Sequence, residues 1–254
     1  MDSVLRGLPF LFVYLDDILI ASASPSEHLG HVKTVLKRLA GAGLSINREK
    51  CCFGVPEVDF LGHRVTPSGI SPLPKKVYTI VAMEQPASKV ELQRFLGCIN
   101  FFHRFIPHLA AVLAPLHALV SSVKTPSAKL SWTPSLVTSF KNAKSALISC
   151  VHLTHPSQGP SVPLSLTTDA SDIAVGAVLA QGDSQQPVGF YSKKLSESEK
   201  KYSAFDKELL ALYLSIRHFR CHLEGRPFTV WTDHKPLCGP VSYTHLTLPT
   251  NREV

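Results

Sequence analysis

The sequence predicts a mixed fold of the α+β and α/β type. Runs rich in β-branched and aromatic residues, such as Phe10–Ile20 and Phe228–Thr232, indicate strands. Between them, apolar residues recur at helical spacing, most clearly from Ser203 to His222. With 254 residues, 44% of them hydrophobic, the chain can bury a substantial core or form two modest domains, and it is too apolar for a disordered protein.

The run Phe10–Ile20 carries two adjacent acids, Asp16 and Asp17, in its middle. Such a run folds most easily as a hairpin that turns at the acids. One interpretation is an ordinary turn with charged residues at its tip. Against it, the flanking residues are very apolar for a surface hairpin, and neither Gly nor Asn marks the turn.

A helix is predicted after this hairpin. Ser24 is placed as N-cap, Pro25 at the first helical position and Glu27 as the closing residue of a capping box, while Gly41 and Gly43 end the helix. Its predicted apolar face consists of Leu29, Val32, Leu36 and Leu39.

The middle of the chain is predicted to be helical. Ser88 and Glu91 form a second capping box, and Thr133–Pro134 opens a further helix. The first of these helices presents Leu92, Phe95, Leu96 and Ile99, and the second presents Leu136, Phe140, Ala143 and Leu147. The segment Thr154–Pro163, with its Pro, Ser and Gly residues, is the best linker candidate.

Basic residues are interleaved with aromatic residues between Leu92 and Pro107. Arg94, His103 and Arg104 stand among several phenylalanines, a pattern that suits stacking on bases and binding of phosphates. The alternative is a helical core with a basic rim.

Three acids further along the chain are predicted to converge. Asp169 follows the apolar run Pro163–Leu166 and Asp233 ends the run Phe228–Thr232, so both are expected at strand ends. Glu208 is expected on a helix whose apolar stripe comprises Phe205, Leu209, Leu212, Ile216 and Phe219. It flanks this stripe and therefore points toward the sheet.

A carboxylate that faces a sheet needs a partner, and hard divalent ions such as Mg²⁺ are suitable ones. Two such ions between shared carboxylates can activate a water and stabilise the leaving oxygen of a phosphodiester. The alternative is that Asp169, Glu208 and Asp233 are ordinary acids at strand ends and on a helix rim.

Charge and composition point to an intracellular protein with a polyanionic partner. The formal net charge is +7, and the basic residues are spread along the chain. The six cysteines show no metal-ligand spacing, which favours free thiols in a reducing compartment. No apolar stretch of a membrane-spanning length and no signal sequence is found, so we expect a cytoplasmic or nuclear location without a membrane.

Segments around the three acids resemble the ribonuclease H domain of gypsy-type LTR retrotransposon Pol polyproteins. The matching segments are TDASDIAVGAVLAQ, KKYSAFDKELLALYLSIRHF and FTVWTDHKPL. The resemblance implies that Asp169, Glu208 and Asp233 are catalytic acids that bind Mg²⁺, or alternatively Mn²⁺. The family's fourth acid belongs well downstream of Asp233, beyond the end of this chain.

The first part of the chain resembles the reverse transcriptase of the same family. Tyr14–Asp17 is similar to its YxDD motif, in which Asp16 and Asp17 would hold catalytic metals. The segment from Phe60 to Ile70 resembles the hairpin that grips the primer, although by pattern alone it is a strand and a turn. The residues that the resemblance assigns to nucleic-acid contact are Tyr14, Gly62, His63, Arg94 and Arg104.

The resemblance divides the chain into the end of a reverse transcriptase palm (1–82), thumb and connection helices (83–153) and an incomplete ribonuclease H-like domain (154–239). Residues 240–254 resemble the translation of a sequencing adapter and are expected to be non-native. The implied function is RNA-directed DNA synthesis and cleavage of RNA–DNA hybrids, with an RNA template, a DNA primer and the rest of the polyprotein as partners.

Some parts of the family's catalytic machinery are not found in this sequence. The first catalytic aspartate of the palm belongs upstream of Tyr14, so the isolated chain is expected to be catalytically incomplete and to show no templated DNA synthesis. The rival hypothesis is a non-catalytic, host-retained module that binds RNA–DNA hybrids through its basic surface.

Overall fold

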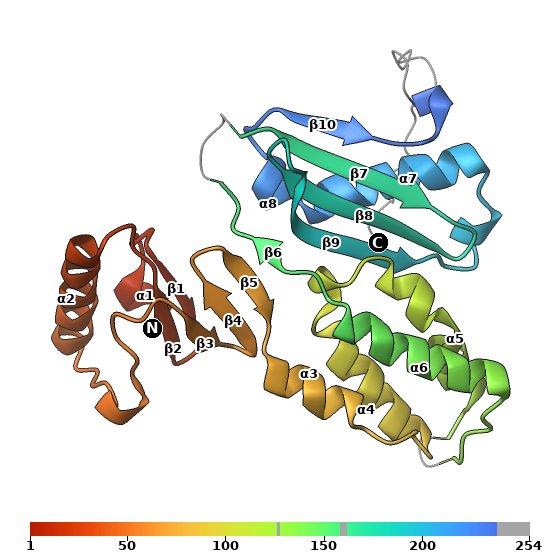
Figure 1. Cartoon of the computed structure of the whole chain (residues 1–254), viewed down its shortest axis with the longest axis horizontal. Coiled ribbons are helices and arrows are strands. Elements are labelled where there is room, and N and C mark those ends of the chain that lie inside the picture. The colour runs from red at the N-terminus through yellow and green to blue at the C-terminus, as the bar shows by residue number, and fades with distance from the viewer. Residues whose placement is uncertain (126–127, 158–161, 238–254) are drawn as a thin grey trace, which may run out of the picture. The chain divides into compact units, whose positions relative to one another are not determined.

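The structure is a computed structural model, and it describes residues 1–125, 128–157 and 162–237. The chain divides into two compact units, Met1–Pro67 and Ser68–Val254 (Figure 1). Both mix helices with strands, as the sequence predicts. The predicted borders at residues 82 and 153 stay predictions, and the predicted tail 240–254 lies outside the described residues.

The first unit is built from two hairpins and a long helix. Its elements are α1 (Asp2–Leu5), β1 (Leu11–Tyr14), β2 (Asp17–Ile20), α2 (Pro25–Gly41), the short 3₁₀ helix η1 (Arg48–Lys50), β3 (Val58–Phe60) and β4 (His63–Thr66). β1 pairs with β2, and β3 pairs with β4, both antiparallel. The predicted hairpin at the two acids is therefore confirmed.

Helix α2 begins as predicted, but its buried side is shifted from the predicted face and has Leu39 in common with it. The Ser24 hydroxyl accepts a hydrogen bond from the Glu27 backbone N–H, and the Glu27 carboxylate accepts one from Ala23. The buried residues are Val35 and Leu39, which pack with Leu5 against residues of β1 and β2. Of the predicted face, Leu29 and Leu36 are exposed. Spacing alone could not choose between the two rows of apolar residues, because the position of the hairpin decides which row is covered.

The second unit combines a helical layer with a sheet. Its first elements are β5 (Gly69–Pro72), α3 (Pro74–Val81), α4 (Lys89–Asn100), η2 (His103–Phe105), α5 (Leu109–Ser122), α6 (Pro134–Ile148) and β6 (Leu153–Thr154). They are followed by β7 (Leu164–Ala170), β8 (Ala174–Gln181), β9 (Gln186–Lys194), η3 (Glu199–Lys201), α7 (Ala204–His218), α8 (Arg220–Leu223), β10 (Phe228–Trp231) and η4 (Lys235–Leu237).

The helical layer forms around the predicted apolar faces of α4 and α6. Their buried residues share one core with residues of η2 and α5, among them Phe105 and Leu116. Ser88 and Thr133 cap these two helices by accepting the N–H groups of Glu91 and Leu136. Both capping predictions are confirmed.

The sheet of the second unit has the strand order β10-β7-β8-β9. β7, β8 and β9 form an antiparallel meander, and β10 joins β7 in parallel (Figure 1). β7 extends to Ala170, so Asp169 is the second-last residue of the strand, in agreement with its predicted place at a strand end. The strand is longer than the apolar run because backbone pairing with β8 continues as far as Ala170.

Helices cover both faces of this sheet. Adjacent residues of a strand point to opposite faces. On β9, Phe190 packs into the core of the helical layer, whereas Tyr191 packs with Leu212 of α7 and its neighbours. The helical layer and α7 therefore lie on opposite sides of β9.

The side chain of Gln181 binds the backbone of the predicted linker at two residues. Gln181 is 5% exposed; its amide donates to the His155 carbonyl and accepts the Ser157 N–H. Residues 158–161 of this segment lie outside the described residues. In the described part of the chain, no helix has the length and apolar character needed to cross a bilayer.

Candidate metal centre and nucleic-acid interface

The three predicted acids of the second unit meet at one end of the sheet. β7 and β10 run parallel, so Asp169 near the end of β7 and Asp233 just after β10 reach the same edge. Glu208 comes from the second turn of α7. One carboxylate oxygen from each residue lies within 4.8 Å of the others. The structure therefore brings together three groups, the first and last of which are 64 positions apart in the sequence.

Glu208 is the most unusual member of this cluster. Its side chain is 7% exposed, and its Oε1 accepts a hydrogen bond of 3.2 Å from the Ala170 backbone N–H. Its Oε2 has no hydrogen-bond partner among the described residues. Burial raises the pKa of Glu208, and repulsion from Asp233 and Asp169 adds to this effect. The cluster is thus short of positive charge.

The face of α7 that holds Glu208 differs from the predicted stripe. Phe205 and Ile216 are exposed, whereas Lys207, Glu208, Ala211 and Ser215 are buried. The small side chains of Ala211 and Ser215 allow the helix to approach the sheet closely, so that Glu208 reaches the end of β7. The prediction that Glu208 points toward the sheet is correct, but the stripe used to argue it is wrong at Phe205 and Ile216.

Residues around the cluster that the sequence did not single out hold it in place. The Ala170 N–H fixes one oxygen of Glu208. Lys207, 9% exposed, forms an ion pair of 2.7 Å with Asp172 and so ties α7 to the turn after β7. A signal for Lys207 exists in the sequence, since it adjoins Glu208, but nothing in the spacing predicts its partner.

These residues fit a divalent metal ion. Hard cations such as Mg²⁺ and Mn²⁺ prefer carboxylate oxygens, and all three groups supply them. The buried Oε2 of Glu208 has an unused acceptor that a cation would satisfy. Asp169 and Asp233 are exposed, which leaves the centre open to solvent and to a substrate.

The acids of the first unit lie at a tight hairpin. Tyr14 pairs with Asp17, so Leu15 and Asp16 form a two-residue turn. Leu15 has a φ of +51°, a left-handed conformation that costs a bulky residue about 1–2 kcal/mol. Leu15 is 77% exposed and Tyr14 is 51% exposed, so the turn presents both acids to solvent.

Gly62 and His63 belong to a second hairpin, which also has a two-residue turn. Phe60 pairs with His63, and the turn residues Leu61 and Gly62 have φ values of +47° and +79°. Positive φ at both positions gives the turn type that matches the twist of paired strands, and Gly62 adopts it without strain. The segment is a hairpin, which agrees with both interpretations of the sequence.

The two predicted basic contacts have different surroundings. Arg94 is exposed on α4. Arg104 is half-buried beside Phe105, with its guanidinium carbon 5.6 Å from the centre of that ring. Burial lowers the pKa of Arg104. Arg94 is thus exposed to a ligand in solution, whereas Arg104 is partly covered by its neighbours and presents only part of its side chain.

Comparisons with protein families identify both units. Residues 1–65 match the reverse transcriptase (RNA-dependent DNA polymerase) family. Residues 132–230 match the RNase H-like domain found in reverse transcriptase. These two matches make the chain an enzyme segment by family, with a reverse transcriptase part followed by a ribonuclease H-like part.

Full-length relatives are much longer than this segment. It is 39% identical over 246 residues to the transposon Tf2-3 and Tf2-7 polyproteins of Schizosaccharomyces pombe. These matches cover 95% of the chain but 18% of each polyprotein. The chain is a segment of an LTR-retrotransposon Pol polyprotein.

Solved structures of a foamy viral protease-reverse transcriptase have a similar fold. The form in complex with double-stranded DNA is 25% identical with a TM-score of 0.81, over 94% of this chain and 42% of that one. The form in complex with an RNA/DNA hybrid is 26% identical with a TM-score of 0.80, over 91% and 31%.

Proposed function

We propose that Asp169, Glu208 and Asp233 form the metal centre of a ribonuclease that cleaves the RNA strand of RNA–DNA hybrids. The observation that supports this proposal is the convergence of three carboxylates around the buried, unpartnered Oε2 of Glu208. Mg²⁺ is the proposed ion and Mn²⁺ the alternative. Bound ions would supply charge stabilisation and an activated water for phosphodiester hydrolysis.

The protein's own groups prepare this chemistry. The Ala170 N–H orients the Glu208 carboxylate, and α7 holds it at the end of β7. Asp169 and Asp233 flank it from two strands whose parallel pairing fixes their separation. Regular secondary structure and strand pairing thus fix the backbone positions of all three acids, which lowers the entropy cost of binding an ion.

We further propose that Asp16 and Asp17 contribute to RNA-directed DNA synthesis in a gypsy-type element. The exposed two-residue turn with a strained Leu15 supports this role, since strain of this kind collects at functional sites. Tyr14, Gly62, His63, Arg94 and Arg104 are the proposed nucleic-acid contacts. The RNA template, the DNA primer, their hybrid and the rest of the polyprotein are the proposed partners, at an intracellular location.

Metal binding and hybrid cleavage by the full chain test the nuclease proposal. Asp169→Asn should abolish Mg²⁺ binding measured by calorimetry, together with any Mg²⁺-dependent cleavage of a labelled hybrid. Asp183→Asn is the matched control, because it removes the same charge from an exposed turn outside the cluster.

Each outcome of this experiment discriminates between hypotheses. Equal Mg²⁺ binding by the parent and Asp169→Asn would show that the acids are structural. Hybrid binding without metal binding or cleavage would favour the non-catalytic binding module.

A further inference from the structure

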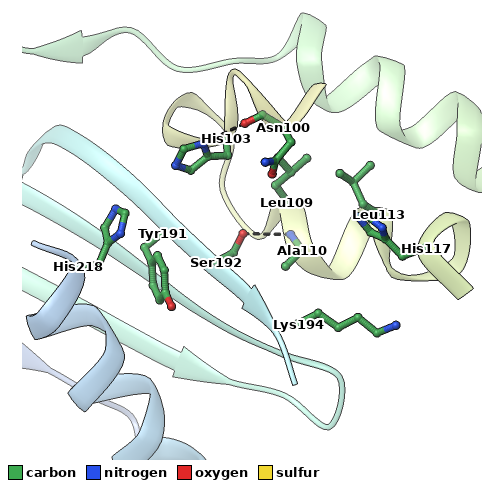
Figure 2. A pocket seen from close by; sticks show the side chains of 10 residues that line it. All are labelled: Asn100, His103, Leu109, Ala110, Leu113, His117, Tyr191, Ser192, Lys194 and His218. Atoms are coloured by element: carbon green, nitrogen blue, oxygen red, sulfur yellow. Dashed lines mark hydrogen bonds between the residues drawn. The ribbon is translucent and has the colours of Figure 1, made fainter. Parts of the chain in front are cut away.

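A second polar site lies in the second unit, away from the carboxylates. A solvent-open cavity of about 280 Å³ forms between the helical layer, strand β9 and the end of α7 (Figure 2). Its polar lining consists of Asn100, His103, His117, Tyr191, Ser192, Lys194 and His218. None of the described residues that line the cavity is acidic.

The basic groups of the cavity repel one another. Partial burial lowers the pKa of His117, and the charge of Lys194 lowers it further. Burial also lowers the pKa of His218, with added repulsion from His103, His222 and Arg104. An anion would relieve this repulsion, because it favours the charged form of every one of these groups.

An acid that acts on the cavity wall is already engaged in an ion pair. Glu199 forms an ion pair of 2.6 Å with Lys193, and it acts on Tyr191 of the cavity wall by raising the pKa of that phenol, after the larger effect of burial. Lys193 and Lys194 are neighbours on a strand, so they point to opposite faces. The Lys193–Glu199 pair therefore leaves the charge of Lys194 directed to the cavity.

A hydrogen bond between α5 and β9 fixes the position of Ser192 in the cavity wall. The Ala110 N–H, in the first turn of α5, donates to the Ser192 hydroxyl at 3.0 Å (Figure 2). Figure 2 also shows Lys194 and His117 on one side of Ser192, and His103 and His218 on the other. A ligand above Ser192 would have nitrogen donors on both sides.

Strand pairing relates the cavity to the carboxylate cluster. Asp169 pairs with Gly176 of β8, and Gly176 pairs with Ser192 of β9, so the three residues form one row across the sheet. Two strand spacings of about 4.8 Å separate Asp169 from Ser192 by roughly 10 Å. This span corresponds to about three nucleotides along one strand of a duplex.

We propose that this cavity binds a backbone phosphate of the nucleic acid whose RNA strand is held at the carboxylate cluster. Lys194 supplies the charge, and the side chains of His117, His103 and Asn100 supply directed donors. That the phosphate belongs to a nucleic acid rests on the proposed nuclease function. The preference for a phosphate group rests on the cavity alone.

Lys194→Gln in the full chain tests this site. Binding of a labelled RNA–DNA hybrid is measured by fluorescence anisotropy from low to moderate salt. We expect weaker binding and a log–log salt slope that is smaller by about 0.7–0.9, the contribution of one phosphate. Lys141→Gln removes the same charge from the exposed side of α6 and should leave the slope unchanged.

A titration with inorganic phosphate, followed by the side-chain NMR signals of the histidines, separates the two possible sources of the phosphate. Shifts of His117 and His218 in the parent, lost in Lys194→Gln, support a phosphate site. If phosphate gives these shifts but Lys194→Gln leaves hybrid binding unchanged, the site takes a free phosphate and the nucleic-acid assignment is wrong. No shifts, or equal effects of Lys141→Gln and Lys194→Gln, would overturn the proposal.

Asp169→Asn distinguishes failure of this site from failure of the nuclease proposal. This variant should lose Mg²⁺ binding and keep the phosphate response of His117. A loss of both in Asp169→Asn would show that the two sites are not separate and would contradict the inference.

Discussion

Glu208→Gln probes the carboxylate cluster at its buried member. The amide keeps an oxygen for the Ala170 N–H and replaces the unpartnered Oε2 with a donor that can bind the Asp169 or Asp233 carboxylate. A buried polar atom without a partner costs about 1–3 kcal/mol. We expect the metal-free variant to gain about 1 kcal/mol in free energy of unfolding, or about 2–4 °C in Tm for a unit of this size.

The metal response should have the opposite sign. An ion present at 100 times its Kd stabilises a protein by about 2.7 kcal/mol, which raises the Tm by roughly 5–10 °C. Thermal unfolding with and without Mg²⁺ should show this rise in the parent and little in Glu208→Gln. Glu224→Gln is the control, since Glu224 is an exposed carboxylate paired with Arg220 on α8.

The pH dependence gives a third readout of the same change. The pKa of Glu208 is raised in the folded protein, so the folded state holds this proton more tightly than the unfolded state. The free energy of unfolding of the metal-free parent therefore falls as the pH rises from the ordinary carboxyl value through the raised one. Because the amide does not titrate, the advantage of Glu208→Gln should grow over this window.

The contrary result is clear. If Glu208→Gln lowers the metal-free Tm, and Mg²⁺ shifts the parent and the variant equally, Glu208 is a structural acid and the metal assignment is wrong.

Three further changes test the backbone and capping arguments. Gly69→Ala should destabilise the second unit by about 2–4 kcal/mol in urea denaturation, since its Cβ would overlap the Leu153 carbonyl oxygen at a φ of +153°; an unchanged midpoint would contradict this. Leu15→Asn should stabilise the first unit by about 0.5–1 kcal/mol, because Asn tolerates the left-handed conformation, and a lower midpoint would show that Leu15 is not strained. Ser88→Ala should cost about 1 kcal/mol at neutral pH. The bond from Ala87 to Glu91 lowers the pKa of Glu91, so its stabilisation should be lost only as the pH falls through that lowered value.

Local features of the fold were predictable from the sequence. The caps at Ser24, Ser88 and Thr133 need only residues within one helical turn, and each forms as predicted. The hairpin at Asp16 and Asp17 was also predictable, because its apolar flanks and central acids lie within one short run. These interactions do not depend on the rest of the chain.

Features that depend on distant partners were predicted less well. On α2 and α7 the sequence offers more than one apolar row, and the packed hairpin or sheet selects the row that is buried. Ala211 and Ser215 contribute little to an apolar pattern in the sequence, yet both are fully buried where α7 packs on the sheet.

The cavity could not be predicted from spacing at all. His103, His117 and His218 come from three different elements and show no motif. The three acids, in contrast, were predictable from their places at two strand ends and on a helix that faces the sheet, and the resemblance to a known family pointed to the same residues.

Phe190 makes the helical layer and the sheet of the second unit rigid with respect to each other. This residue belongs to the sheet but packs into the core of the helical layer, and the bond from Ala110 to Ser192 joins the same two layers nearby. Rotation of the helices against the sheet would have to expose that ring and break that bond. For a duplex that contacts both layers, the distance between the helical layer and the carboxylate cluster would therefore be constant. In the proposed nuclease, the position of cleavage would be set by the point at which the helices bind the duplex.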